Sequence, residues 1–444
     1  MKPALAANGG SRVVPEGITR RWPQITEDER AAVLRVLDSG VLSGSLAPEV
    51  RALEKEFAEY TGARHCLSTN SGTSALHIAV AAAGIQPGDE VITSAFTFLA
   101  SALAVLHHNA IPVFADIDPM TFNIDPKEID RRITPRTRAI MPVHIHGLPA
   151  DMDEILSIAR RHNLIVIEDA AQAHGALYKG RRVGTIGDMG AFSIQSSKNL
   201  SAGEGGLFVT NEDGFHHRAN CVRQFGEEAA DTSLAGVDPD RPLDDLRDYN
   251  AVMMGWMYRM TSLTAAVARC QLARLDEFNR NAARNAEYLT ERLSKLDLVA
   301  PPSVPADRTS VFHKYRVRLH PERLGAAMEP TGFRTALIQA LRQEGVEVVL
   351  WQTTPVPSQI LFQKQLGYGG GCPWKCQNSS VRYQEEDYPR TRELLDNSIV
   401  IGSQSAPLAA QNLGLMRYYG DAFEKVLADR DTLIRMARDA SRST

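Results

Sequence analysis

The chain has 444 residues, of which 43% are hydrophobic and 23% are charged. These proportions are typical of a globular protein with two or three domains and exclude a largely disordered chain. Its 49 lysines and arginines are balanced by 53 acidic residues, which gives a formal net charge of -4. Such a balance offers no electrostatic basis for binding nucleic acid or an anionic membrane, but it does not exclude small neutral or anionic ligands.

Cysteine usage and the lengths of the apolar segments predict the cellular compartment of the protein. Five cysteines are scattered along the chain, an odd number that argues against a disulfide framework. No apolar run approaches membrane-spanning length, and the short apolar stretch near the beginning is too brief for a signal-peptide core. We therefore expect a cytoplasmic protein. Cys372 and Cys376 form a C-x3-C pair, but without companion ligands this is a weak metal signal, and no metal is expected.

The chain begins with a polar arm, which we assign to residues 1–24. The spacing of apolar side chains then predicts a helix over 26–39. Thr26 and the acidic residues after it are typical of a helix start, and Gly40 is typical of a helix end.

A large domain is predicted over residues 25–262. Between residues 65 and 210, helix-length amphipathic stretches separate short apolar runs, which are EVITSA, IPVFADID, RAIMPVHIHG, LIVIEDAAQ, GAFSIQ and GGLFVTN. This rhythm predicts an α/β domain whose sheet is mostly parallel and covered on both faces by helices.

Residues 262–297 sustain a helical period with many arginine and glutamate pairs, so we expect one long helix, or two, to lead out of the large domain. A smaller C-terminal α+β domain is predicted over residues 263–444. Its expected elements are a strand at FHKYRVRL, a helix at FRTALIQALRQEG and a strand at VEVVLW. The Gly- and Pro-rich stretch from 366 to 389 indicates a long loop.

Reactive side chains stand where several predicted strands end, and in an open α/β sheet ligands bind beyond the carboxyl ends of the strands. Asp169 ends the run LIVIED, and Gln172 follows three residues later. Ser193 lies near the end of GAFSIQ, and Lys198 lies in the loop after it. Taken singly, such residues have ordinary interpretations, because a loop lysine is usually solvated and such an aspartate usually caps a helix or turn.

Together these residues suit pyridoxal 5′-phosphate (PLP). A helix that opens at Gly72 and Thr73 offers backbone N–H groups to a phosphate, and Ser193 could add a hydroxyl donor. Asp169 could keep the pyridine nitrogen protonated, which makes the ring an electron sink. Phe98 could stack on that ring. No Walker-type loop or GxGxxG fingerprint competes with this interpretation.

Lys198 is the predicted Schiff-base lysine. A free lysine titrates at roughly 10.4, so its amine must be made neutral before it can form an imine. A partly desolvated site that holds other cationic groups would lower that pKa. The amine released during turnover is the natural base for a 1,3-proton shift.

Seven segments in one order carry a resemblance to a known family. They are APEVRALEKEFAEYTGARH, NSGTSALHIAV, GDEVITSAFTFLASALAV, PVFADIDPMTFNID, ITPRTRAIMPVHIHGLPADMD, IEDAAQAHGALYKGRRVG and FSIQSSKNLSAGEGGLFVTN. They resemble the DegT/DnrJ/StrS family of PLP-dependent aminotransferases, over about residues 15–320.

The resemblance implies a fold-type-I PLP transferase that forms a homodimer with two active sites at the subunit interface. It implies that Lys198 is the Schiff-base lysine, that Asp169 is the pyridinium partner and that Gln172 lies beside the cofactor's 3-hydroxyl. Phe98 sits where the family stacks an aromatic ring. The implied phosphate cup consists of Gly72, Thr73 and Ser193. Some members carry histidine in place of the lysine and dehydrate a sugar carbon, and Lys198 argues against that chemistry here.

One position departs from the family pattern. Many members place an asparagine, which reaches the phosphate across the dimer, where this chain has Arg259 in GWMYRMTSL. An arginine offers a charged and bidentate phosphate contact, so the role could survive with a different residue. The ordinary alternative is a surface arginine near a helix start.

The wording RRWPQITEDER, SIQSSKNLSAGEGG and GWMYRMT resembles aminotransferases that act on keto-cyclitols such as scyllo-inosose and its 2-deoxy form, and also 3-amino-5-hydroxybenzoate synthases. The resemblance implies glutamine or glutamate as amino donor and a role in antibiotic or other secondary-metabolite biosynthesis. The alternatives are a nucleotide-linked keto-sugar aminotransferase, another PLP reaction such as dehydration, and a non-catalytic PLP-binding regulator. Candidates for binding substrate hydroxyl groups are His146, His174, His313 and Tyr315, although a structural hydrogen bond is the ordinary role of each.

Overall fold

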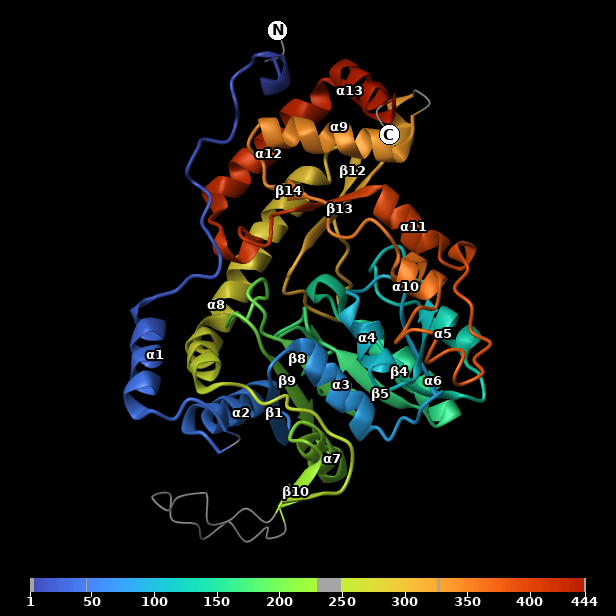
Figure 1. Cartoon of the computed structure of the whole chain (residues 1–444). Helices are drawn as coiled ribbons and strands as arrows, with labels where there is room; N and C mark the ends of the chain where they lie inside the picture. The colour runs from blue at the N-terminus through green and yellow to red at the C-terminus, as the bar shows by residue number, and fades with distance from the viewer. Residues whose placement is uncertain (1–3, 45, 230–248, 326–327, 443–444) are drawn as a thin grey trace.

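The computed structural model describes residues 4–44, 46–229, 249–325 and 328–442. A central sheet of seven strands, in the order β1-β9-β8-β5-β4-β2-β3, forms the middle of the large domain (Figure 1). Its strands are β1 (His65–Thr69), β2 (Glu90–Ser94), β3 (Ile111–Ala115), β4 (Thr137–Met141), β5 (Ile165–Asp169), β8 (Met189–Ser193) and β9 (Gly206–Thr210). Only β9 runs antiparallel to its neighbours, so the predicted mostly parallel α/β sheet is confirmed.

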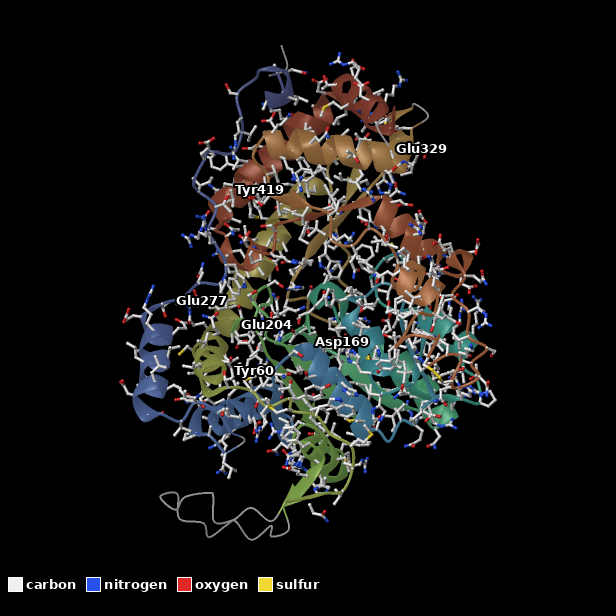
Figure 2. All side chains as sticks on the ribbon, viewed as in Figure 1. Tyr60, Asp169, Glu204, Glu277, Glu329 and Tyr419 are labelled. Atoms are coloured by element: carbon white, nitrogen blue, oxygen red, sulfur yellow. A yellow bond between two sulfur atoms is a disulfide. The ribbon has the colours of Figure 1, made fainter. Side chains whose placement is uncertain are left out.

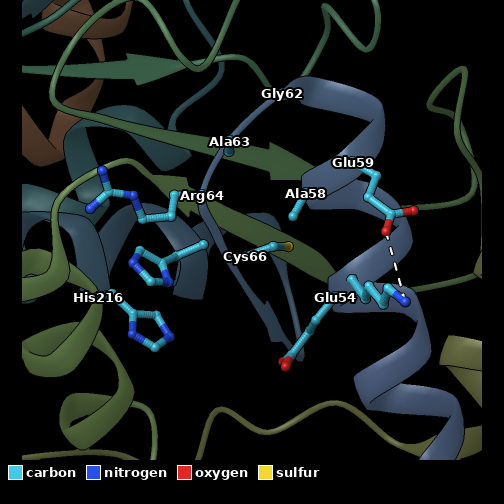
Figure 3. Close-up of a pocket in the computed structure, with 10 residues that line it drawn as sticks. Glu54, Ala58, Glu59, Gly62, Ala63, Arg64, Cys66 and His216 are labelled. Atoms are coloured by element: carbon cyan, nitrogen blue, oxygen red, sulfur yellow. Dashed lines mark ion pairs between the residues drawn. The ribbon is translucent and has the colours of Figure 1, made fainter.

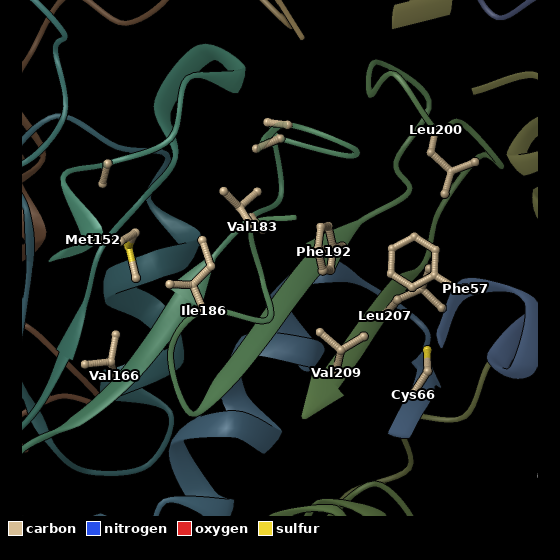
Figure 4. Close-up of a cluster of buried hydrophobic side chains, with 14 of the residues drawn as sticks. Phe57, Cys66, Met152, Val166, Val183, Ile186, Phe192, Leu200, Leu207 and Val209 are labelled. Atoms are coloured by element: carbon tan, nitrogen blue, oxygen red, sulfur yellow. The ribbon is translucent and has the colours of Figure 1, made fainter. Parts of the chain in front are cut away.

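Helices cover both faces of this sheet. Successive residues of a strand point to opposite faces, so each strand contributes side chains to two apolar clusters. In β5, Val166 faces one apolar cluster and Ile167 the other. The first cluster includes side chains of α2 (Pro48–Thr61), α5 (Pro126–Arg132), α6 (Met152–His162) and the first half of α8 (Ser262–Leu293), as Figure 4 shows in part. The second includes side chains of α3 (Gly72–Ala82), α4 (Ala100–Leu106) and α7 (Asp213–Val222).

A four-stranded antiparallel sheet forms the smaller domain, in the order β12-β13-β15-β14. Its strands are β12 (Val299–Ala300), β13 (Tyr315–Leu319), β14 (Val348–Val349) and β15 (Ser398–Ile401). Its helices are α9 (Pro330–Gln343), α12 (Leu413–Ala428) and α13 (Arg430–Arg442), which lie at the top of Figure 1. The remaining α-helices are α1 (Glu27–Ser39), α10 (Ile360–Gln363) and α11 (Pro389–Asp396). Two small antiparallel sheets pair β6 (Leu177–Tyr178) with β7 (Arg181–Arg182) and β10 (Glu227–Ala229) with β11 (Tyr249–Ala251).

Helix α8 and the N-terminal arm both contribute side chains to the small-domain core. Helix α8 begins in the large-domain core and ends in the small-domain core, where Ala286 and Leu289 are buried. Leu5 and Val14 of the N-terminal arm are buried in the same small-domain core. The first predicted helix is present as α1, with the Thr26 side chain bonded at its start and Gly40 in the left-handed conformation at its end.

The predicted loop over 366–389 belongs to a longer segment that packs on the large domain. Trp374 and Tyr383 are buried there together with Phe114 of β3, and the Trp374 indole donates to the Tyr383 hydroxyl at 2.8 Å. Cys372 and Cys376 form a disulfide, which the cysteine count did not predict. This bond closes a turn of the same loop and does not connect distant parts of the chain. Among the described residues, no helix is long and apolar enough to cross a membrane, and no cluster of three potential metal ligands occurs.

Glu344 attaches the N-terminal arm to the small domain. Its carboxylate accepts hydrogen bonds from the backbone N–H groups of Ala6 at 2.8 Å and Val13 at 3.1 Å. The same carboxylate lies 2.8 Å from the Lys425 ammonium of α12, and its side chain is 1% exposed. A buried carboxylate with three such donors holds the arm in one position.

We expect Glu344→Ala to lower the free energy of unfolding by roughly 3–5 kcal/mol, because it leaves the buried Lys425 ammonium without a counter-charge, with only the main-chain oxygen of Ser11 as acceptor. Urea unfolding measures this change. Glu291→Ala is the matched control, since it removes an exposed ion pair with Lys295 and should cost at most about 1 kcal/mol. Equal unfolding midpoints for the two variants would contradict this role of Glu344.

Candidate active site

The first turn of α3 and the end of β8 form a cradle for an anion. Ser71 caps the helix, and its hydroxyl accepts the Ser74 N–H at 3.0 Å. The N–H groups of Gly72 and Thr73 belong to the turn that has no acceptor within the helix. A Cβ atom at Gly72 would lie 2.5 Å from the Cβ of Ser193, so only glycine fits this close approach. These donors can surround a phosphate at the positive end of the helix dipole.

Asp169 lies at the end of β5, where its buried carboxylate has defined partners. Its Oδ2 accepts a hydrogen bond from the Ser101 hydroxyl at 2.7 Å, and its Oδ1 accepts the Ala171 N–H at 3.1 Å. Burial raises the pKa of Asp169, while the Ser101 hydrogen bond and the charge of Lys198 oppose that rise. Figure 2 shows Asp169 on the side of the large domain that faces the small domain. A cationic N–H group would therefore find a desolvated carboxylate here.

The neighbouring carboxylate, Glu168, points to the other face of β5 and holds the structure around it. It accepts hydrogen bonds from three backbone N–H groups, those of Gly184, Ile186 and Gly187. His144 lies 2.8 Å from it through Nε2, while its Nδ1 accepts the Ala150 N–H, so the proton is on Nε2. Because all these partners belong to the chain itself, we assign Glu168 to the scaffold.

Lys198 follows β8, and three elements from outside that strand fix its loop. The indole N–H of Trp22, in the N-terminal arm, donates to the main-chain oxygen of Lys198 at 3.1 Å. The side-chain amide of Asn199 donates to Asn279 of α8 at 3.0 Å and to the main-chain oxygen of Val311 at 2.9 Å. Desolvation lowers the pKa of Lys198 to about 8, and the charge of Asp169 opposes that shift. At pH 7 about a tenth of the amine is then neutral, a far larger fraction than for a free lysine.

Gln172 and Phe98 extend this site. The Gln172 side-chain oxygen accepts the backbone N–H of His146 at 2.8 Å, which leaves its amide nitrogen as the end that can donate to a ligand. Phe98 lies between β2 and α4 with 57% of its surface exposed, so one face of the ring is open. Arg259 is partly exposed and makes no hydrogen bond or ion pair to any residue that the structure describes.

Three of the four predicted substrate residues lie buried near Lys198. Desolvation and the charge of Lys198 lower the pKa of His174 to about 3 and that of His313 well below its usual value. By hydrogen-bond geometry, neither ring nitrogen of His174 has a partner among the described residues, although the Ser193 backbone lies close enough to raise its pKa slightly, and the Nδ1 atoms of His146 and His313 are likewise unpaired there. These neutral rings are available to bind hydroxyl groups.

Tyr315 does not join them, which corrects its prediction as a substrate residue. It is buried in the small-domain core, and its hydroxyl lies 2.8 Å from that of Thr290 on α8. Alternation along β13 explains the error, because Tyr315 and Val317 share the core face whereas Lys314 and Arg316 point the other way. Sequence reasoning therefore missed Lys314 and Arg316, although the alternating letters of FHKYRVRL were the signal that could have revealed them.

A surface hollow of about 500 Å³ near β1 contains none of the predicted residues (Figure 3). It is lined by residues of α2, β1 and α7, including Glu54, Cys66 and His216. The His65 and His216 rings stack there at 4.2 Å, and His65 bonds to Asp213 at 2.7 Å. With its polar groups paired in this way, this hollow is not the candidate active site.

Comparison with known proteins matches the aminotransferase family DegT/DnrJ/EryC1/StrS over residues 23–382. The chain belongs to this family. It is 40% identical to a GDP-perosamine synthase of Caulobacter vibrioides, over 73% of this chain and 81% of that protein. It is 39% identical to an L-glutamine:scyllo-inosose aminotransferase of Streptomyces griseus, over 74% and 77% of the two chains. The crystal structure of 3-amino-5-hydroxybenzoic acid synthase matches with a TM-score of 0.77 and 28% identity, over 95% of this chain and 100% of that one.

The family makes this protein a PLP-dependent aminotransferase with the fold-type-I architecture, as the sequence predicted. The residues present fit the cofactor. The cradle at Gly72 would be filled by any larger side chain, and Asp169 offers its carboxylate at a strand end. The depressed pKa of Lys198 suits a lysine that has to react as a neutral amine.

We expect Gly72→Ala to weaken cofactor binding by at least about tenfold, because the new methyl group would displace Ser193 from the phosphate cradle. The measurement is a titration of the visible absorption band with PLP. Gly214→Ala is the matched control, since a Cβ atom there meets only the Arg218 side chain at 3.8 Å. Equal affinities of the two variants would mean that the phosphate lies elsewhere.

Proposed function

We propose that this aminotransferase transfers the amino group of glutamine or glutamate to a keto-cyclitol, such as scyllo-inosose or its 2-deoxy form, in secondary-metabolite biosynthesis. The observation that carries the proposal is the group of buried neutral histidines near Lys198, His146, His174 and His313, each of which has at least one ring nitrogen that bonds to none of the described residues. A polyhydroxylated ketone needs several such hydrogen-bonding groups. The similarity to the Streptomyces griseus scyllo-inosose aminotransferase supports the same acceptor class.

The chain's own residues divide the work of this reaction. Gly72, Thr73 and Ser193 bind the cofactor phosphate, and Asp169 holds a proton on the ring nitrogen. Ser101 fixes the Asp169 carboxylate by its hydrogen bond. PLP, when bound, supplies an electron-withdrawing ring that stabilises negative charge on the substrate carbon.

Lys198 both holds the cofactor and moves the proton. With PLP bound, its amine would be the base that takes a proton from the donor's α-carbon and the acid that returns one on the cofactor side of the nitrogen. Gln172 donates its amide N–H beside the ring, and Phe98 covers one ring face. The loop contacts of Trp22 and Asn199 keep Lys198 in place during both half-reactions.

We also infer that two chains pair to complete each site. Arg259 has no partner among the described residues, and large apolar side chains stand exposed close to it in sequence. Met254 is 81% exposed, and Val252 and Met257 are each 48% exposed. Exposed apolar residues gathered in this way mark protein interfaces. In a dimer, Arg259 would reach the cofactor phosphate of the neighbouring subunit.

A nucleotide-linked keto sugar is the second candidate acceptor. The GDP-perosamine synthase of Caulobacter vibrioides, at 40% identity, favours it. A keto-cyclitol differs from such a substrate by lacking the nucleotide and its diphosphate, so the two candidates can be separated directly.

L-Glutamine should bleach the visible absorption band of the purified holoenzyme, and scyllo-inosose or its 2-deoxy form should restore the band. Nucleotide-linked 3- or 4-keto sugars should restore it poorly, because the proposed pocket recognises ring hydroxyls and gains nothing from a nucleotide. Stopped-flow absorbance measures both half-reactions. Rapid restoration by a nucleotide sugar, with neither inosose active, would move the assignment to the second candidate.

Lys198→Ala should lose the visible band and lower turnover by roughly 10²–10⁴-fold, the usual contribution of a positioned acid or base. Asp169→Asn should retain the cofactor through the phosphate contacts but slow proton transfer. Borohydride reduction followed by mass spectrometry identifies the modified lysine, with Lys179→Ala as the control. A reduced adduct on another lysine, or near-normal turnover of Asp169→Asn, would refute the respective role.

Mixing Arg259→Ala protein with Lys198→Ala protein should restore activity if the sites are shared. Half of the randomly formed dimers are hybrids, and each hybrid has one site with both residues intact, so about a quarter of the wild-type activity is expected. Native mass spectrometry confirms subunit exchange. Complete exchange without recovered activity would place Arg259 outside the partner's site.

A further inference from the structure

Lys314 and Arg316 carry positive charges that the chain itself leaves without an acid. Arg316 lies on the face of β13 that is turned away from the small-domain core, and Lys314 immediately precedes this strand; 2% and 6% of their surfaces are exposed. Among the described residues, neither forms an ion pair with a carboxylate. Buried charges in proteins are normally paired, because removing an ion from water is costly. Two neighbouring cations without an acid therefore indicate that the anion comes from outside the chain.

Arg316 is held rigidly but keeps donors for a ligand. Its Nε donates to Nε2 of His146 at 3.0 Å, and its two terminal nitrogens donate to the Ser398 hydroxyl and to the main-chain oxygen of Trp351. The guanidinium also stacks over the Phe96 ring at 5.0 Å. These contacts use three of five N–H groups, so two remain.

His146 adds a neutral donor to the same place. Because its Nε2 accepts from Arg316, the neutral ring carries its proton on Nδ1, and that atom has no partner. Lys314, Arg316 and His146 line one narrow cavity between the large domain and β13. This cavity therefore presents an ammonium, a guanidinium and an imidazole N–H, the donor set that binds a carboxylate.

The cavity adjoins the cofactor site. The backbone N–H of His146 donates to the Gln172 side-chain oxygen. The backbone N–H of Lys314 donates to the main-chain oxygen of His146, with 3.5 Å between nitrogen and oxygen. Burial and the charges of Lys198 and Arg316 lower the pKa of Lys314 to about 8, so Lys314 and Lys198 are close enough to repel one another. An amino acid whose nitrogen reacts beside Lys198 can thus place a carboxylate near Lys314.

We propose that the cavity formed by Lys314, Arg316 and His146 binds a carboxylate of the amino donor, with Lys314 as the residue that determines donor affinity. The proposal rests on the proposed function, because it assigns the donor to the same site. The acceptor, a neutral keto-cyclitol, makes no use of the Lys314 charge. The two half-reactions therefore depend on Lys314 to different extents.

Lys314→Met tests this assignment with little change of volume, whereas Lys314→Arg keeps the charge. In the holoenzyme, Lys314→Met should raise the L-glutamine concentration for half-maximal bleaching by at least about tenfold. Restoration of the band by scyllo-inosose should change by less than about threefold, and Lys314→Arg should recover most of the donor affinity. Lys179→Met, which removes an exposed lysine paired with Asp153, is the matched control.

A non-reactive anion separates this proposal from the proposed function. Glutarate, which has no amino group, should raise the melting temperature of the wild-type holoenzyme and of Lys179→Met but not that of Lys314→Met. Failure of every amino donor to bleach the wild-type band, with the glutarate effect intact, would refute the transferase proposal and leave the anion site standing. Unchanged glutamine dependence in Lys314→Met would overturn the anion site.

Two further outcomes would also overturn the assignment of the cavity to the donor carboxylate. Loss of the visible band in Lys314→Met would mean that the lysine binds the cofactor. Stabilisation of the wild type by inorganic pyrophosphate and not by glutarate would mean that the cavity binds a diphosphate of a nucleotide-linked substrate.

Discussion

Three buried cationic side chains, Lys198, Lys314 and Arg316, lie where the large domain meets the small-domain strand β13. The charge of Asp169 acts on Lys198, whereas neither Lys314 nor Arg316 forms an ion pair with a carboxylate of the described residues. Desolvation consequently lowers the pKa of both lysines to about 8 and that of Arg316 to about 9. This excess of positive charge favours anions, in line with the proposed phosphate cradle at α3 and the proposed carboxylate site at β13.

Contacts between parts of the chain that are distant in sequence hold these charged side chains in position. The Lys198 loop is bonded to Trp22 in the arm, and its neighbour Asn199 is bonded to Asn279 of α8 and to Val311 before β13. The arm in turn is fixed to the small domain by Glu344. A movement of the small domain would therefore shift the Lys198 loop. The N-terminal arm and helix α8 thus help to position Lys198.

Local sequence patterns predicted the elements of the large domain but not the packing of the small one. Each apolar run between residues 65 and 210 forms a strand because a buried parallel strand needs apolar residues on both faces. The position of the arm could not be predicted, since nothing local in residues 1–24 indicates that Leu5 and Val14 pack on another domain. Similarly, the sequence motif identified Lys198 as a candidate. Lys314 could be identified only once the structure showed which face of β13 meets the large domain.

The lack of an acid beside Lys314 has a functional reason. A permanent carboxylate partner would compete with a substrate anion for the ammonium, and a ping-pong enzyme has to release its keto-acid product before the acceptor enters. With a pKa of about 8, Lys314 is mostly charged at neutral pH without being locked in an ion pair. A bound carboxylate would raise that pKa again, so binding of the donor and protonation of Lys314 favour each other. Release of the product reverses both, which leaves the pocket open for a neutral acceptor.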